Sequence, residues 1–538
     1  MKKLLIFAAG ILVTASLFAG GLVTNTNQSA SWVRLPARDA STSIDAVYFN
    51  PAGLMKLNNG FHLSLSNQTI WQNREITNDY GGPGGLFGLN NNTYTGEVFA
   101  PFFPGVYGVY KMDKLAFSFG FNPVGGGGGA TYAGGLPSFD IGPSDLVPAL
   151  APTATAYSVD MEFEGTSVFF GYQGGVSYQI NDLISVFAGV RYVTAKNTYM
   201  GHLTDIELNY GGAWTRADAI MTGISNQAAG AATGMQPLID GGAGSLTFAA
   251  AQSLTIIDAA TRAQLEGGLL SFGVSQAAID AMSLATAQAT YQGFAARYSA
   301  QSTLLNDKEA DVEQTASGVT PIIGINISPS ENLNIGIKYE FATKLEFTNM
   351  VNDNKDILTD ITETGELVYM FVDGSTFNGD MPAMLSLGVD YGVSEDLRVS
   401  VGTHYYFDKS SNYGKKVDGE YVDNDVVIDN NYMEFAGGLE YDLTDKLLVS
   451  AGYLLAKTGV NDLYQSDLSY SLTSNTIGFG GAFKLNDNIV LNLGFGLTTY
   501  KDASITIDHE FVDGSIIQAT ESYAKDNKFV ALGLDFSF

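Results

Sequence analysis

The chain has 538 residues, no cysteine and a formal net charge of −29 at neutral pH. Without cysteine it can form no disulfide framework and lacks the usual structural zinc ligands. Its negative charge argues against binding nucleic acid or anionic lipid through charge. Glycine is frequent, at 62 residues, and tyrosine and phenylalanine are abundant. This composition is typical of long strands, and the acidic excess fits exposed loops that either serve solvation or bind divalent cations.

Residues 1–19 have the pattern of a secretory signal peptide. Lys2 and Lys3 precede the apolar run Leu4–Val13, and small residues lead to Ala19, after which we expect cleavage. The apolar run is too short to cross a bilayer as a helix, and no later stretch reaches about 18 uncharged apolar residues. An exported chain of this kind is either soluble or a membrane barrel.

A polar segment, residues 20–57, follows the signal peptide. Asn, Ser, Thr, Ala and Asp dominate it, with one helix-like run and a break at Asn50-Pro51. Such a segment is too polar to contact lipid. We therefore expect it to lie inside a barrel as a plug, which excludes a general diffusion pore.

From Phe61 onward, apolar residues alternate with small or polar ones, which predicts strands with one apolar face. The other face is rich in Gly, Ser and Asn and also carries the charged residues Arg191, Lys338, Glu340, Arg398 and Glu440. A polar face suits a wet lumen, and an aromatic face suits lipid. Residues 58–538 are therefore predicted to form an all-β, transmembrane antiparallel barrel.

Short turns alternate with long connections, as in outer-membrane barrels. Six short turns and two terminal strands give about fourteen strands; the turns are at Asp113-Lys114, Asn181-Asp182, Ser330-Glu331-Asn332, Ser394-Glu395-Asp396, Thr444-Asp445-Lys446 and Asn486-Asp487-Asn488. The last segment, Lys528–Phe538, has one apolar face and ends in an aromatic residue. That ending resembles the signal recognised during outer-membrane assembly.

One connection, at about residues 203–308, departs from the strand pattern because Ala, Gln and Ser dominate it. Asp258 can cap a helix that runs through Leu265 to Gly267-Gly268, and Ser275 can cap a second helix. We predict an external helical loop. Its apolar faces need cover, either from each other or from a hydrophobic ligand. The simpler alternative is that the helices pack on the barrel rim.

The sequence DAVYFNPAGL at Asp45–Leu54 resembles the FadL/TodX family of outer-membrane transporters for long-chain fatty acids and other hydrophobic compounds. The family's plug motif is matched by Asn50, Pro51 and Ala52, and the segments Thr24–Ser31 and Gly60–Gln72 are also similar to the family. The resemblance implies a monomeric, multi-pass barrel of the bacterial outer membrane, without cofactor or enzymatic activity. It also implies capture of substrate at an external groove and sideways release into membrane lipid through a kink in the third strand.

The third predicted strand contains a matching interruption. Its regular alternation is broken by proline and glycine, which weaken strand pairing; the predicted opening comprises Asn122, Pro123, Gly125, Gly126, Gly127, Gly128 and Gly129. We expect Asn50-Pro51-Ala52 to touch this interruption from inside the barrel. The alternative is that a flexible external loop begins at the interruption.

A fatty-acid carboxylate needs a cationic or hydrogen-bonding partner in an apolar pocket. Arg191, Lys338 and Arg398 are candidates on the lumen face, although each could instead pair with a lumen acid such as Glu340, Asp390 or Glu440. The four histidines are scattered, so no metal site is predicted. His404 has lumen parity, which argues against a barrel phospholipase. Two other functions stay open: a plugged porin for small polar solutes, and a surface binding protein.

Overall fold

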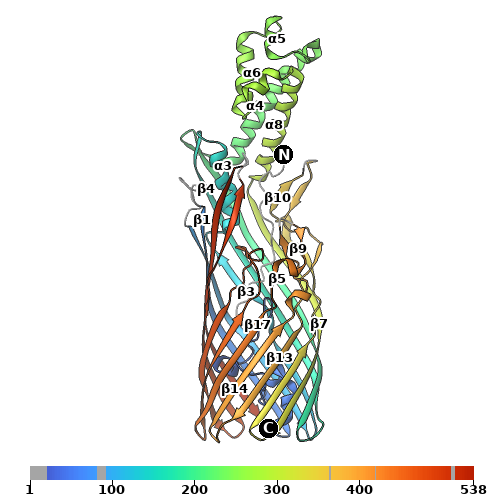
Figure 1. Ribbon diagram of the computed structural model, residues 1–538, viewed down its shortest axis with the longest axis vertical. Helices are drawn as coiled ribbons and strands as arrows, with labels where there is room; N and C mark the ends of the chain where they lie inside the picture. Colours follow the sequence, from blue (N-terminus) through green and yellow to red (C-terminus); the bar gives the residue numbers. More distant parts are fainter. Residues whose placement is uncertain (1–20, 81–91, 363–364, 418–419, 511–514) are drawn as a thin grey trace.

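The computed structural model describes residues 21–80, 92–362, 365–417, 420–510 and 515–538. The predicted signal peptide, residues 1–19, lies outside these residues. Alternating strands close into an antiparallel barrel of fourteen strands (Figure 1). They are β1 (Gly60–Tyr80), β2 (Asn92–Met112), β3 (Leu115–Tyr132), β4 (Ala154–Gln179), β5 (Ile184–Tyr210), β7 (Lys308–Ser330), β8 (Leu333–Glu340), β13 (Met384–Gly392), β14 (Leu397–Tyr406), β17 (Met433–Thr444), β18 (Leu447–Lys457), β19 (Ser474–Asn486), β20 (Ile489–Tyr500) and β22 (Ile516–Ser537).

Four shorter segments belong to the same sheet, and two small hairpins lie outside it. The sheet segments are β6 (Ala213–Arg216), β9 (Glu346–Val351), β12 (Thr376–Asn378) and β21 (Ala503–Glu510). The hairpins are β10–β11 (Leu358–Ile361, Leu367–Tyr369) and β15–β16 (Lys416–Val417, Glu420–Tyr421). The first and last barrel strands close the ring, because Phe61 and Phe538 exchange two backbone hydrogen bonds of 3.1 and 2.9 Å.

All six predicted short turns are confirmed, and each joins two consecutive barrel strands at the same end of the barrel. The predicted alternation is confirmed as well. In β3, for example, Phe117 and Phe119 are exposed on the outer face, whereas Ala116 and Ser118 are buried in the lumen. The apolar side chains thus point outward and the small and polar ones inward.

The helical loop stands at the opposite end of the barrel from the short turns (Figure 1). Its helices are α4 (Ala217–Leu238), the π-helical turn η2 (Ile239–Ala243), α5 (Phe248–Ser253), α6 (Ala259–Ser271), α7 (Gln276–Ala281) and α8 (Leu284–Leu304). Asp258 and Ser275 cap α6 and α7 as predicted, by accepting hydrogen bonds from Thr261 N and Ala278 N. The helix after Asp258 continues past the expected Gly267-Gly268 end, and β5 reaches Tyr210, so the helical part begins later than residue 203. The helices bury their apolar faces against one another.

Two further helices lie in long connections: α3 (Pro137–Ala149) between β3 and β4, and α9 (Asn424–Val427) between β14 and β17. Single 3₁₀ turns are η3 (Asn352–Asn354) and η4 (Asp408–Ser410). No helix among the described residues is long and apolar enough to cross a membrane.

The plug occupies the lumen near the short-turn end and contains α1 (Ala30–Arg34), α2 (Ala46–Phe49) and η1 (Pro51–Lys56). Residues 21–55 are buried except for Thr42 and Ser43. The wall makes room for it at lumen-facing glycines: a side chain on Gly336 or Gly402 would collide with Asp39. The polar plug also has polar partners in the lumen wall, as its composition predicted; for example, the Asn27 side chain donates to Gln68 of β1 at 3.1 Å.

Candidate functional site

The ladder between β2 and β3 is interrupted along the proline- and glycine-rich part of β3. The two strands pair from Met112 and Leu115 to Val106 and Phe121, and a further pair joins Glu97 to Thr131. Among the described residues, no ladder pair joins residues 122–130 to β2. Pairing between β3 and β4 continues through this stretch with two register shifts. The interruption therefore opens one side of β3.

Two glycines allow the chain to bend at this point. Gly126 and Gly128 have φ angles of +89° and +66°, values that side-chain-bearing residues rarely adopt. The chain turns toward the lumen here, because Pro123 and Gly125 are buried although strand alternation would give them the outward parity of Phe121. Glycine is thus needed here both for the backbone conformation and for close approach of the plug.

The first described residues of the plug bond to β3 inside the interruption. Asn25 N donates to Val124 O at 2.9 Å, and Gly126 N donates to Val23 O at 3.1 Å. The Asn25 side chain also donates to Gly126 O at 3.2 Å. These bonds satisfy backbone groups for which β2 supplies no ladder partner, and an unpaired backbone group facing hydrocarbon would be costly. Residues 23–28, the closing segment, therefore cover the interruption from within.

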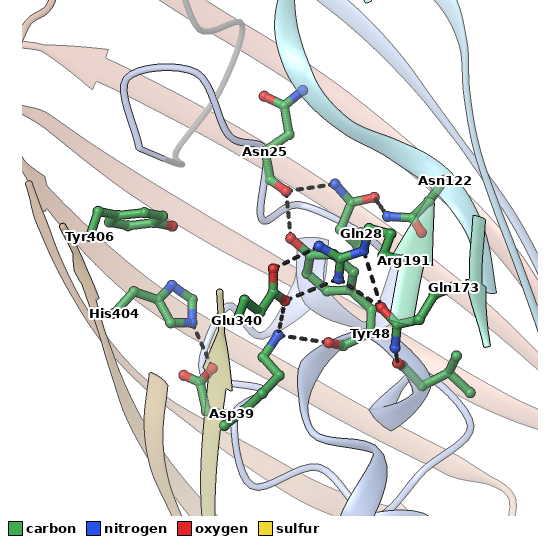
Figure 2. Close-up of polar contacts among 12 residues, drawn as sticks. Asn25, Gln28, Asp39, Tyr48, Asn122, Gln173, Arg191, Glu340, His404 and Tyr406 are labelled. Atoms are coloured by element: carbon green, nitrogen blue, oxygen red, sulfur yellow. Dashed lines mark hydrogen bonds and ion pairs between the residues drawn. The ribbon is translucent and has the colours of Figure 1, made fainter. Parts of the chain in front are cut away.

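Gln28 completes the closing segment with its side chain. Its amide donates to Pro123 O at 2.7 Å and accepts a hydrogen bond from the Asn122 side chain at 2.6 Å (Figure 2). The Tyr107 hydroxyl donates to the Gln28 carbonyl at 2.6 Å. Proline has no backbone N–H with which to bond a neighbouring strand. Its carbonyl can still accept a hydrogen bond, and the Gln28 amide supplies the donor.

A buried ion cluster lies in the lumen wall beside the plug. The Arg191 guanidinium binds both oxygens of Glu340, at 2.6 and 3.0 Å, in a bidentate arrangement. Lys338 Nζ donates to Glu340 at 2.6 Å and to the backbone carbonyl of Tyr48 at 2.8 Å. Gln173 accepts from Arg191 at 2.7 Å, and its own amide donates to the carbonyl of Val47. One carboxylate thus balances two cations, and the cluster holds the plug at α2.

Tyr48 joins this cluster to the closing segment. Its ring lies against both cations, 5.1 Å from Arg191 Cζ and 4.8 Å from Lys338 Nζ. Its hydroxyl donates to the Asn25 carbonyl at 2.8 Å (Figure 2). One side chain therefore connects the wall, the plug helix and the segment that covers the interruption.

Two more contacts hold the plug against β14 and β17, which follow β8 and β13 in the wall. His404 lies between Asp39 of the plug, 2.6 Å from Nε2, and Glu434 of β17, which approaches Nδ1. Both ring nitrogens are engaged with carboxylates, so neither is left to activate a nucleophile. Arg34 of α1 forms a buried ion pair with Glu440.

Within the plug, Arg38 and Asp45 form a bidentate pair with N–O distances of 2.8 and 2.9 Å. Burial opposes ionisation of Asp45, but the Arg38 guanidinium outweighs it and keeps the pKa of Asp45 below its usual value. Hydroxyl groups of Ser29 and Ser41 also donate to this carboxylate. The loop between α1 and α2 is therefore closed by a charged link.

The wall on the outer side of the interruption is aromatic. Phe99 and Phe102 of β2 are 63% and 79% exposed, and Phe99 stacks on Trp71 of β1 with ring centroids 5.8 Å apart. These rings flank the strand segment that lacks ladder pairing with β3. The interruption thus has polar plug groups inside and apolar rings outside.

No protein-family profile matches the chain, and no curated protein matches it in sequence. Among solved structures, a FadL homologue of Pseudomonas aeruginosa matches 96% of this chain and 100% of its own, with 14% identity and a TM-score of 0.56. The toluene transporter TodX of P. putida matches 92% of this chain and 94% of its own, with 14% identity and a TM-score of 0.48. The Ralstonia pickettii toluene transporter TbuX covers the same shares, with 15% identity and a TM-score of 0.46.

The chain has the FadL fold. This assignment rests on the FadL homologue, because the two toluene transporters fall below a TM-score of 0.5. At this level of identity the comparison establishes architecture, and residue roles must come from the geometry of this chain.

Within the FadL fold, the plug motif lies against a different wall from the one we expected. The Asn50 side chain donates to Ile325 O at 3.0 Å, and the carbonyls of Pro51 and Ala52 accept from Ser177 and Ser185 at 2.6 and 2.7 Å. The hydrogen bonds of the motif therefore go to β4, β5 and β7. The interruption in β3 is bonded instead by residues 23–28, which the sequence did not single out for this contact.

The three proposed carboxylate-binding cations already have acidic partners. Arg191 and Lys338 share Glu340, as the alternative interpretation of the sequence stated. Arg398 lies beside the short turn before β14, half-exposed, 3.2 Å from Asp390 and 3.9 Å from Glu440. Arg191 and Lys338 therefore anchor the plug, whereas Arg398 is at the mouth of the barrel.

Proposed function

We propose that the protein is a passive transporter for hydrophobic compounds in the bacterial outer membrane, where it acts as a monomer and releases its cargo sideways through the interruption in β3. One observation carries this proposal: the closing segment supplies the backbone hydrogen bonds that β2 does not make with β3. A wall held shut by a short plug segment can open without breaking a barrel ladder.

Cargo enters at the end that carries the helical loop, where an external groove captures it, and moves toward the plug. Displacement of residues 23–28 exposes the stretch Pro123–Gly129, which contains five glycines and so has few side chains to block passage. Each methylene that moves from water into an apolar environment gains about 0.8 kcal/mol. The exposed rings of Phe99 and Phe102 then receive the cargo on the lipid side.

The buried cations bear on the class of cargo. Arg191 and Lys338 are compensated by Glu340 and hold Tyr48, so binding a fatty-acid carboxylate there would require breaking the plug anchor. We therefore assign these two wall residues the role of holding the plug. The proposal covers both long-chain fatty acids and uncharged hydrocarbons, which partition into the same apolar path.

The second candidate, a plugged porin for small polar solutes, is favoured by the polar lumen wall. Uptake by intact cells separates the two. Cells that express the protein should take up radiolabelled dodecane or oleate several-fold faster than cells without it, with equal uptake of a small sugar. Faster sugar uptake with unchanged dodecane and oleate uptake would support the porin and contradict our proposal.

A further inference from the structure

A second break in the barrel wall lies between β7 and the chain that forms β8 and β9. β7 pairs with β8 as far as Ile322 and Glu340, and pairs with β9 at Thr315 and Thr348. Between these points the chain leaves the wall and folds inward. This break is separate from the interruption in β3 and lies on another part of the barrel.

The inward segment, residues 341–345, is held by specific contacts. Thr343 exchanges backbone hydrogen bonds of 3.0 and 2.9 Å with Met381. Leu345 N donates to the Asp380 carboxylate at 3.0 Å, and its carbonyl accepts from Gly379 N at 2.9 Å. Leu345 is fully buried as a result. These hydrogen bonds therefore fix the inward position of the segment.

On the outer side, the displaced segment leaves a groove of about 1290 Å³. Its apolar lining includes Val168, Phe170, Ala195, Ala316 and Leu345. Lys196 and Lys344 lie at its edges, and each is already ion-paired, with Glu313 and Asp380 respectively. The lining also includes the acid Glu346, which would repel a carboxylate, so the groove favours an uncharged chain over an anionic one.

The groove begins where the outward apolar band of the barrel ends. The stretch from Phe170 to Gln179 at the end of β4 spans ten strand residues, and about 9–11 tilted strand residues cross a bilayer. On β7, the residues below the groove are apolar and exposed, including Val319 and Ile323. The groove therefore opens at the outer edge of the hydrocarbon layer, within reach of molecules dissolved in it.

The inner side of the same segment faces an aromatic cluster in the lumen. Leu345 belongs to a buried core with Phe169, Phe347 and Met381, and the rings of Phe169 and Phe347 lie 5.8 Å apart. A side chain on Gly125 of β3 would touch Phe169 and Met381. A single apolar layer thus connects the floor of the groove to the interruption in β3.

We propose that this groove is a second binding site for the hydrophobic cargo, which takes a hydrocarbon chain directly from the membrane and passes it by Leu345 to the aromatic cluster. The inference rests on the proposed transport function. Cargo would then have two ways into the barrel: from the end that carries the helical loop, and from the membrane through this groove. The ligand class is an uncharged hydrocarbon chain, represented by dodecane.

The chain contains no cysteine, so single introduced thiols report on one position. Ser317 lines the groove and is exposed, whereas Ser504 on β21 is exposed and does not line it. In phosphatidylcholine nanodiscs, dodecane should slow maleimide labelling of Ser317→Cys about tenfold and leave Ser504→Cys unchanged. If a bilayer lipid fills the groove instead, Ser317→Cys labels slowly from the start and dodecane has no effect, which overturns the proposal.

A second measurement tests transport itself. Ser317→Trp fills the groove from the exposed side without altering the core, and should reduce dodecane uptake about fivefold, whereas Ser504→Trp should not. The groove proposal is overturned if dodecane leaves the labelling of Ser317→Cys unchanged, or if Ser317→Trp takes up dodecane as fast as the wild-type protein does. Loss of the broader transport function is recognised separately, because the wild-type protein would then fail to increase uptake at all.

Discussion

The Tyr48 hydroxyl donates a hydrogen bond of 2.8 Å to the backbone carbonyl of Asn25. Tyr48 also lies against the buried cations Arg191 and Lys338, and Asn25 donates to Val124 in the interrupted part of β3. This bond therefore couples the charged anchor of the plug to the segment that covers the wall. A change at the anchor can therefore reach the interruption through this bond.

Tyr48→Phe removes this bond and keeps the ring over the cations. A neutral hydrogen bond contributes about 1 kcal/mol, so the amides of Asn25 and Gly126 should exchange hydrogen about fivefold faster. Tyr406→Phe is the matched control, because its hydroxyl bonds to Glu434 at 3.0 Å, away from the closing segment. Equal exchange in both variants would show that Tyr48 does not stabilise the closed state.

Glu340→Ala leaves Arg191 and Lys338 buried without the carboxylate that they share. Breaking a buried pair by removing one partner costs about 3–5 kcal/mol, so the plug should loosen and the heat-induced unfolding of the barrel should shift downward. The control Glu313→Ala removes an acid paired with the exposed Lys196 and should change little, because exposed pairs contribute about 0–1 kcal/mol. Similar shifts in both variants would refute the anchoring role.

The buried pair of Arg38 and Asp45 predicts a pH dependence of the plug. The pKa of Asp45 is lowered in the folded state, so the unfolded plug binds more protons in acid. The stabilisation is present above the unfolded pKa, about 3.9, and is lost as the pH falls below it. Acrylamide quenching of Trp32, which is buried in α1, should rise in this range.

This measurement needs a background in which only the plug tryptophan remains. Trp71→Phe and Trp214→Phe remove the two other tryptophans, both of which are exposed. In that background, Asp45→Asn should show raised quenching already at neutral pH and little further change in acid. An unaltered acid profile in Asp45→Asn would assign the transition to other carboxylates.

The helical loop predicts the orientation of the barrel in the cell. Arg262 lies on α6 of the helical loop, which projects beyond the end of the barrel (Figure 1). Trypsin added to intact cells should cleave there first, because the loop faces outward. Cleavage only after the outer membrane is made permeable would mean that the loop faces the periplasm and that the direction of transport must be reversed.

Local patterns in the sequence predicted most of the fold. The turn at Asp113-Lys114, the caps Asp258 and Ser275, and the glycine break after Pro123 all depend on neighbours in the chain, so each could be recognised without tertiary information. The lengths of α4 and α8 could not be predicted in the same way. Their sequences are rich in Ala, Gln and Thr, and the two helices are stabilised by packing against each other.

The site was less accessible because its contacts join residues far apart in the sequence. Gln28 bonds to Pro123 across 95 positions and Tyr107 to Gln28 across 79, and no periodicity records such pairs. Charge alone could not distinguish a ligand-binding Arg191 from one paired with Glu340. The inward fold at Leu345 depends on Asp380 and Met381, which belong to a different strand connection.

The central claim is that the closing segment must leave β3 for cargo to pass. Gln28→Cys and Asn122→Cys place two thiols where the native side chains share a hydrogen bond, and a short cross-linker that reductant cleaves can join them. The control pair Ser31→Cys and Asn492→Cys ties α1 to β20, where the native side chains lie 3.3 Å apart. Uptake of dodecane is then measured before and after reduction. Our account predicts that the first cross-link blocks uptake, that reduction restores it, and that the control cross-link has little effect. Full uptake through the barrel cross-linked at Gln28 and Asn122 would contradict lateral release through β3.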